Sequence, residues 1–279
     1  MMTVMLQIYD KLRAPSLLAL AAAGGALIAL PAAAEAACDL SDGYAEDVVS
    51  YVEEVDACLA GADVFAADRE SAVAELTNAV RDRAGLAPLE RRTSLDKAAR
   101  AHALDMATRG YAGHSDLENR GHVYRMRALD RQVLASATGA NIVVLNAKAS
   151  ADDILDAIRG DAANRENLER AGFNATGLGI AEADGRIYVV QMLTTVDGEL
   201  ESPLPLQIAG ATSFQPRVTE DYFRTAGWNL TDAEGKRLAG GQMMRLTAES
   251  LDQPGNAYLD VLVELGTDTY VLRGPIVSR

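Results

Sequence analysis

The sequence predicts an α+β fold in which helices come first, an antiparallel hairpin follows and a β-rich region ends the chain. Apolar residues with a helical period occupy the segment from Asp68 to Gly110. The dipeptide Asp184-Gly185 then joins two apolar strands, and short strands with polar turns fill residues 205–279. Because helices and strands are segregated along the chain, we expect no parallel dinucleotide-binding sheet.

Composition limits the classes of partner that this chain can have. Its 279 residues are 49% hydrophobic, which is enough to bury a core and excludes disorder throughout. The formal net charge is −14, and such a surface repels nucleic acid and anionic membranes. We therefore expect no nucleic-acid partner.

Residues 1–36 have the order of features of a secretory signal peptide. Lys11 and Arg13 precede an apolar segment, residues 14–30, and the small residues that follow end in Ala36. A membrane anchor is the alternative, but the apolar segment is shorter than the roughly 20 residues that span a bilayer. We expect cleavage after Ala36, a periplasmic or secreted mature protein, and membrane contact only through the uncleaved leader.

Cys38 and Cys58 are the only cysteines, and an even pair in an exported protein favours a disulfide. Lipid modification of Cys38 is the alternative, although it would require a larger aliphatic residue where Glu35 stands. The segment Tyr44–Leu59 predicts an amphipathic helix, so Cys38 reaches Cys58 only if the preceding residues lie back along that helix.

Three further helices are predicted before the hairpin. The first begins near Asp68 and ends before Gly85, and the second places His102 on its buried stripe and ends at Gly110. We expect His102 to be a hydrogen-bonded core residue. The third begins at Ser150 and is expected to continue without interruption through residues 161–169.

Four possible metal ligands lie close together between two of these helices: His114, Asp116, Glu118 and His122. Imidazole and carboxylate groups are accepted by Zn²⁺ and similar ions. The spacing matches no compact helical ligand pair, and glycines flank the segment, so we expect a solvated turn. A divalent-metal site here stays an alternative.

The chain resembles a known family through several motifs in order: "LTNAVRDRAGLAPL", "AARAHALDMATRGYAGHS", "GAN", "AIRGDAANRENL" and "GFNATGLGIA…IYVVQML". These are similar to motifs of bacterial members of the CAP superfamily, the cysteine-rich secretory, antigen 5 and pathogenesis-related proteins. The resemblance implies an α-β-α sandwich with a small antiparallel sheet. It also implies a cleft where two histidines and two glutamates meet in many members, some of which bind a divalent metal there while others carry sterols or fatty acids elsewhere.

The family residues transfer only in part. His114, in "GHS", matches the first cleft histidine, but Ala140 stands at a glutamate position and Asn164 at that of the second histidine. The resemblance thus leaves His114, Asn141, Asn164 and Gln191 as candidate cleft residues. One imidazole with amides gives neither three good metal ligands nor an acid-base pair, so we expect no resident cofactor.

These features predict five regions: a signal peptide (1–36), a helical segment with the cysteines (37–67), a CAP-like domain (68–196), a linker (197–204) and a β-rich module (205–279). In the β-rich module Trp228 and Met243-Met244 are expected to be core residues, with a binding face as the alternative.

The function expected from the sequence is non-catalytic binding of a small apolar molecule, a cell-envelope fragment or a protein. Two alternatives stay open. One is a metal-assisted hydrolase, for which a second imidazole near His114 is the distinguishing feature. The other is an adhesion or assembly protein that works through the β-rich module.

Overall fold

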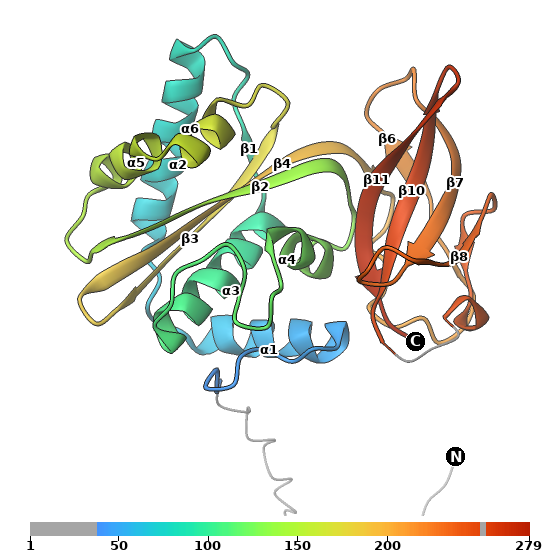
Figure 1. The fold of residues 1–279 in the computed structure, drawn as a ribbon, viewed down its shortest axis with the longest axis horizontal. Coiled ribbons are helices and arrows are strands. Elements are labelled where there is room, and N and C mark those ends of the chain that lie inside the picture. Colours follow the sequence, from blue (N-terminus) through green and yellow to red (C-terminus); the bar gives the residue numbers. More distant parts are fainter. Residues whose placement is uncertain (1–37, 252–254) are drawn as a thin grey trace, which may run out of the picture. The chain divides into compact units, whose positions relative to one another are not determined.

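A computed structural model of the chain describes residues 38–251 and 255–279 (Figure 1). The predicted signal peptide and its cleavage point lie outside these residues. Within the described part of the chain, no helix combines the length and the apolar character needed to cross a bilayer.

The described residues form six α-helices, of which α1, α5 and α6 begin directly after a residue whose side chain caps the helix. Asp47 caps the first helix by accepting hydrogen bonds from the backbone N–H groups of Val49 and Ser50, and Gly110 ends the third with a φ of 69°. The helices are α1 (Val48–Gly61), α2 (Ala67–Arg83), α3 (Thr93–Arg109), α4 (His122–Leu129), α5 (Ala151–Gly160) and α6 (Ala162–Glu169).

Two predictions of helix extent were wrong. The first helix begins at Val48, not at Tyr44, because the Asp47 side chain caps it there. The predicted third helix is two helices, because Asp161 has an extended backbone (ψ 134°) and its carboxylate accepts from Asn164 N–H as the cap of α6.

The hairpin prediction is confirmed. Strands β3 (Ala175–Ala183) and β4 (Arg186–Leu200) pair antiparallel, and the turn between them places Asp184 and Gly185 at φ 48° and 71°. The other strands are β1 (Glu90–Arg91), β2 (Val133–Asn146), β5 (Thr212–Ser213), β6 (Pro216–Val218), β7 (Arg224–Thr231), β8 (Arg237–Gly241), β9 (Arg245–Leu246), β10 (Ala257–Leu265) and β11 (Asp268–Val277).

The sheet of β2, β3 and β4 lies between two helical layers, as the α-β-α expectation requires (Figure 1). On one face α1, α3 and α4 share an apolar core with residues such as Val190, and on the other α2, α5 and α6 share one with Val189. At Gly177 and Gly179 the backbone of α3 lies so close to β3 that a Cβ would meet it at 2.2 to 2.3 Å. Glycine is therefore required at both positions.

The C-terminal region is β-rich, as predicted. Strands β7, β8, β10 and β11 pair antiparallel. Strand β11 also pairs with β2 at Arg273↔Ala135. The strands of the sandwich and of the C-terminal region therefore form one sheet, in the order β1-β3-β4-β2-β11-β10-β7-β8. Trp228 is buried in the core of this region, as expected, and its indole N–H donates to the Met243 carbonyl at 2.6 Å. The expectation that Met243 is a core residue was wrong, because it is 80% exposed, whereas Met244 is partly buried against this core.

The predicted disulfide is present. Cys38 and Cys58 are joined, with 4.7 Å between their Cα atoms, so the residues before α1 do lie back along the helix. Helix α1 then packs on the sandwich through Tyr51, Val52 and Val55. The bond makes residues 38–58 a covalent loop. This loop includes most of α1, the helix that contacts α3 and α4.

Candidate functional site

The four residues predicted as possible metal ligands lie in the loop between α3 and α4 and at the first residue of α4. His114 is exposed and His122, the first residue of α4, is half-buried, and their ring centroids lie 6.5 Å apart. Asp116 is buried, and Glu118 is half-buried. The structure thus brings two imidazoles together, whereas both carboxylates point elsewhere.

Asp116 and Glu118 are each held by arginines. Asp116 accepts from the backbone N–H of Arg120 at 2.7 Å and from its Nε at 2.8 Å. Glu118 accepts two hydrogen bonds from Arg109, at 2.6 and 2.8 Å, and the pKa of its carboxyl is lowered mainly by these bonds. The expectation that these acids belong to a solvated turn was wrong, because both carboxylates pair with arginines of the protein.

Asp105, Asp116 and Glu118 each offer an oxygen within 4.8 Å of the others, which is the spacing of a metal site. Three guanidinium groups, those of Arg109, Arg120 and Arg125, balance their charge. A cation would have to displace an arginine that already donates two hydrogen bonds to a carboxylate. This donor set therefore does not fit a resident metal. We call these six residues the arginine cluster.

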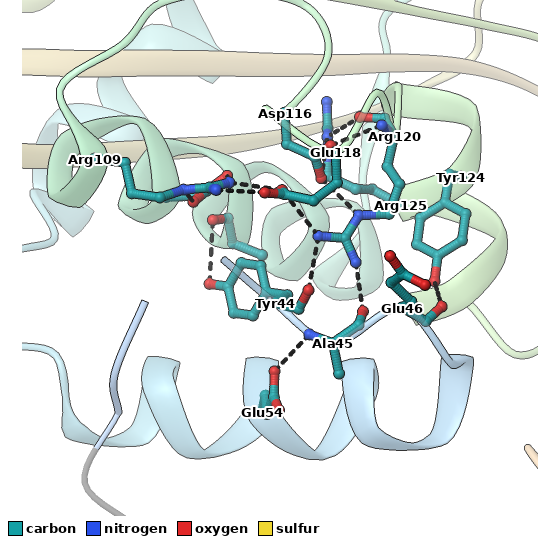
Figure 2. Close-up of polar contacts among 12 residues, drawn as sticks. Tyr44, Ala45, Glu46, Glu54, Arg109, Asp116, Glu118, Arg120, Tyr124 and Arg125 are labelled. Atoms are coloured by element: carbon teal, nitrogen blue, oxygen red, sulfur yellow. Dashed lines mark hydrogen bonds and ion pairs between the residues drawn. The ribbon is translucent and has the colours of Figure 1, made fainter. Parts of the chain in front are cut away.

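The arginine cluster joins the disulfide-closed segment to the loop (Figure 2). Arg120 donates to the backbone carbonyls of Tyr44 and Ala45, and its guanidinium lies 5.0 Å from the ring centroid of Tyr51 and 5.7 Å from that of Tyr124. No sequence motif predicts this contact. The one available signal is that three acids and three arginines occur within residues 105–125, on both sides of the predicted turn.

The buried side chain of Arg125 holds the loop in place through hydrogen bonds to its backbone. This side chain is 2% exposed and donates to the carbonyls of His114 and Arg120 at 2.6 Å each. Because both acceptors are backbone atoms on either side of Asp116, the path of the loop is set by this one buried side chain. The position of the exposed His114 follows from it.

His102 is a core residue, as predicted. It is 1% exposed, and its Nε2 lies 2.7 Å from the carbonyl oxygen of Gly113, to which the neutral ring donates. Burial, and to a smaller extent the nearby charge of Arg125, lower the pKa of His102 to about 3. Burial also lowers the pKa of His122. Both rings are therefore neutral at pH 7.

The other predicted cleft residues lie on the opposite face of the sheet. Asn141 donates to Gln191 at 3.0 Å, Gln191 donates to the hydroxyl of Thr77 on α2 at 2.9 Å, and Asn167 on α6 donates to Asn141 at 3.1 Å. Asn141 and Gln191 are almost fully buried. We call these four residues the amide cluster.

Ala140 and Asn164, where the resemblance implies a glutamate and a histidine, also lie on opposite faces of the sheet. Ala140 packs into the core shared by α1, α3 and α4, whereas Asn164 is buried on α6, where its Nδ2 donates to the Ile142 carbonyl. The structure therefore does not bring Asn141, Asn164 or Gln191 together with His114. A histidine at position 164 would extend from α6, away from the loop of His114.

A large open cavity lies beside β4, between the residues that pair with β3 and those that pair with β6. Its volume is about 760 Å³, and its lining includes Arg92, Asn174, Glu199 and Arg217. We call it the β4–β6 cavity. Neither His114 nor His122 contributes to it.

Residues 74–193 match the model of the CAP family, the cysteine-rich secretory protein family. Together with the α-β-α sandwich, this match identifies residues 74–193 as a CAP domain. No curated protein matches the sequence.

Two solved structures resemble the chain in part. An outer surface protein of Borrelia burgdorferi shares 15% identity over 46% of this chain and 93% of its own, with a TM-score of 0.42. An extracellular protein of Bacillus anthracis that contains an SCP domain shares 22% identity over 46% of this chain and 40% of its own, with a TM-score of 0.39.

Proposed function

We propose that this protein is exported and binds a polar fragment of the cell envelope without catalysis. Export is supported by the leader pattern and by the Cys38–Cys58 disulfide, which is typical of oxidising compartments. The observation that carries the binding proposal is the β4–β6 cavity. Its size lies in the roughly 300–1,000 Å³ range of small-molecule sites, and its walls carry charged side chains.

The polar lining selects among the ligand classes that the sequence left open. A sterol or fatty acid requires a predominantly apolar surface, because each unpaired polar group that it covers costs free energy. The charged side chains of Glu90, Arg92 and Arg217 line this cavity, so a ligand with its own polar groups is favoured.

The absence of catalysis is supported by how the acids are held. General acid-base chemistry needs a carboxyl or imidazole pair with separated pKa values that can reach one substrate. Near His114 the acids Asp116 and Glu118 are bonded to arginines. The family's glutamate position is occupied by Ala140, which is buried and has no ionisable group.

Cosedimentation with purified insoluble cell-wall material tests this proposal. The chain without residues 1–36 should sediment with the material and release no soluble fragments from it. Failure to sediment contradicts the binding proposal, and fragment release contradicts the non-catalytic part. His114→Ala should sediment as the unaltered chain does.

Metal-assisted hydrolysis is the second candidate, and one observation favours it. His122 supplies the second imidazole near His114, with 6.5 Å between ring centroids. Calorimetric titration with Zn²⁺ separates the two candidates. We expect weak binding or none, since a catalytic Zn²⁺ site needs about three protein ligands. Tight binding that is lost in both His114→Ala and His122→Ala would favour the hydrolase.

A further inference from the structure

The β4–β6 cavity exists because two strands share one edge of β4 and leave a gap between them. Strand β3 pairs with β4 as far as Ala175↔Thr194, and β6 begins to pair at Gly198↔Val218. In the gap, the Asn174 side chain bonds both backbone groups of Val196, at 2.8 and 2.9 Å. Both backbone polar groups of Val196 are thus satisfied although neither strand pairs with β4 at this residue.

Gly198 sets the far wall. A Cβ at this position would lie 2.3 Å from the Arg217 carbonyl oxygen, so β6 can approach β4 this closely only because the residue is glycine. The wall is therefore part of the sheet and not a loop. A ligand would meet a cavity that is formed before it binds.

The walls carry an excess of negative charge. Arg92 pairs with Glu199 at 2.5 Å and Arg217 with Glu201 at 2.8 Å. Glu90 is exposed on the same lining and has no side-chain hydrogen bond or ion pair with any residue that the structure describes. Three carboxylates face two guanidinium groups, which leaves one acid for a ligand.

Neutral groups on the lining are also available. Ser202 and Thr219 are exposed, and neither hydroxyl has a hydrogen-bond partner within residues 38–251 and 255–279. Gln132 donates through Nε2 to the Leu200 carbonyl, which leaves its side-chain oxygen as an acceptor. A ligand with hydroxyl or amide groups would find partners beside Glu90.

We infer that the β4–β6 cavity binds a small polar ligand through a primary ammonium group, with Glu90 as its ion-pair partner. The inference rests on the proposed function and names the site and the ligand chemistry. The net charge of −14 favours the approach of cations over anions. Two envelope components share this chemistry: an amino sugar with a free amine and a peptide with a free lysine-type amine.

Calorimetry with four probes tests the inference on the chain without residues 1–36. The probes are a glucosamine disaccharide, its N-acetylated form, the dipeptide lysyl-alanine with its α-amine acetylated, and the same dipeptide with both amines acetylated. At least one free amine should bind at least tenfold tighter than its acetylated partner. The tighter of the two free amines identifies the source. Equal affinity of each amine and its acetylated form would overturn the inference.

Two variants locate the binding. Glu90→Gln keeps the size of the side chain and should weaken amine binding at least tenfold, whereas Glu166→Gln, an exposed change on α6, should leave it unaltered. Ser202→Trp should block the cavity, with a thermal melt as the check on folding. Unchanged affinity in Glu90→Gln and Ser202→Trp would show that the amine binds elsewhere.

The results that would contradict this inference differ from those that would contradict the proposed function. If the chain sediments with cell-wall material but Glu90→Gln sediments equally and no amine probe binds, the function stands and the assignment of the cavity is wrong. If an amine probe binds in a Glu90-dependent way but nothing sediments, the cavity stands and its ligand is not an insoluble envelope component.

Discussion

The arginine cluster and the amide cluster lie on opposite faces of one sheet and satisfy their polar atoms in different ways. In the first, three carboxylates balance three guanidinium groups around a loop. In the second, neutral amides and one hydroxyl form a chain of hydrogen bonds between helix and strand. Both clusters contain residues that the sequence marks as candidate ligands, and in both the polar groups of those residues are bonded within the cluster: Asp116 and Glu118 to arginines, and Asn141 to Gln191.

The difference predicts unequal costs of disruption. Removing one partner from a buried ion pair leaves an uncompensated charge, which costs about 3–5 kcal/mol. Removing one partner from a buried amide pair leaves an unpaired dipole, which costs about 1–3 kcal/mol. The loop of His114 should therefore be the more sensitive region, although it is the more exposed one.

The largest effect is expected at the centre of the arginine cluster. Arg120→Ala should lower the free energy of unfolding by about 3–5 kcal/mol, because Asp116 stays buried with its main cationic partner removed. Urea denaturation measures the loss, and Arg186→Ala, an exposed change at the start of β4, is the control.

A second substitution checks the cause. Adding Asp116→Asn to Arg120→Ala should recover part of the lost stability, since the buried group is then neutral. If the double variant is less stable than Arg120→Ala by the full cost of Asp116→Asn alone, the charge of Asp116 is not the source of the loss.

The hairpin and the helices before it could be predicted because their signals are local, whereas the sandwich was implied only by the family resemblance. Asp184-Gly185 between two apolar strands, and the helical period before Gly110, each depend on neighbouring residues. The break at Asp161 was missed because the apolar residues on both sides, such as Ile158 and Leu168, keep to one buried face. An N-cap aspartate inside such a pattern was the available signal.

The candidate site could not be predicted to the same extent, because its geometry depends on distant pairs. The Arg120 bond to the Tyr44 carbonyl joins residues 76 apart, and Gln191 meets Thr77 across a separation of 114. Spacing along the chain does not show which acids are already paired with arginines. It therefore made Asp116 and Glu118 candidate ligands, whereas the structure makes them partners of arginine.

The disulfide should rank second among the expected effects. Replacing both Cys38 and Cys58 with serine releases a loop with a sequence separation of 20. For a loop of this size the loss is about 3 kcal/mol in the chain-entropy model. The segment also supplies the Tyr44 and Ala45 carbonyls that Arg120 bonds, so the two effects should be coupled.

A double-mutant cycle measures that coupling. The losses from the paired cysteine change and from Arg120→Ala should sum to more than the loss in the combined variant, because each change weakens the same contact. Strict additivity would show that the arginine cluster holds the loop independently of the N-terminal segment.

The amide cluster should give a smaller effect. Asn141→Ala should cost about 1–3 kcal/mol, because the side-chain oxygen of Gln191 loses its donor and Asn167 loses an acceptor. The measurement is urea denaturation at pH 7 and pH 5. Since no ionisable group is removed, the loss should be equal at the two pH values, and unequal losses would contradict the neutral character of this cluster.

The last expected effect is a pH dependence of stability that comes from His102. Its pKa in the folded protein is about 3, against an ordinary 6.5, because the ring is buried. Between these values the unfolded chain binds a proton that the folded chain does not, so stability should fall as pH decreases below about 6.5. The slope from this group is at most about 1.4 kcal/mol per pH unit.

His102→Gln tests this dependence, because glutamine can still donate to the Gly113 carbonyl but does not titrate. The variant should lose less stability than the unaltered chain between pH 7 and pH 5. His122→Gln should reduce the slope in the same direction, since burial lowers the pKa of His122 as well. An unchanged slope in both variants would contradict the assignment of this pH dependence to buried imidazoles. Carboxylates whose pKa is lowered by arginines, as that of Glu118 is, lose their stabilising contribution only at lower pH, as the unfolded carboxyl groups begin to bind protons.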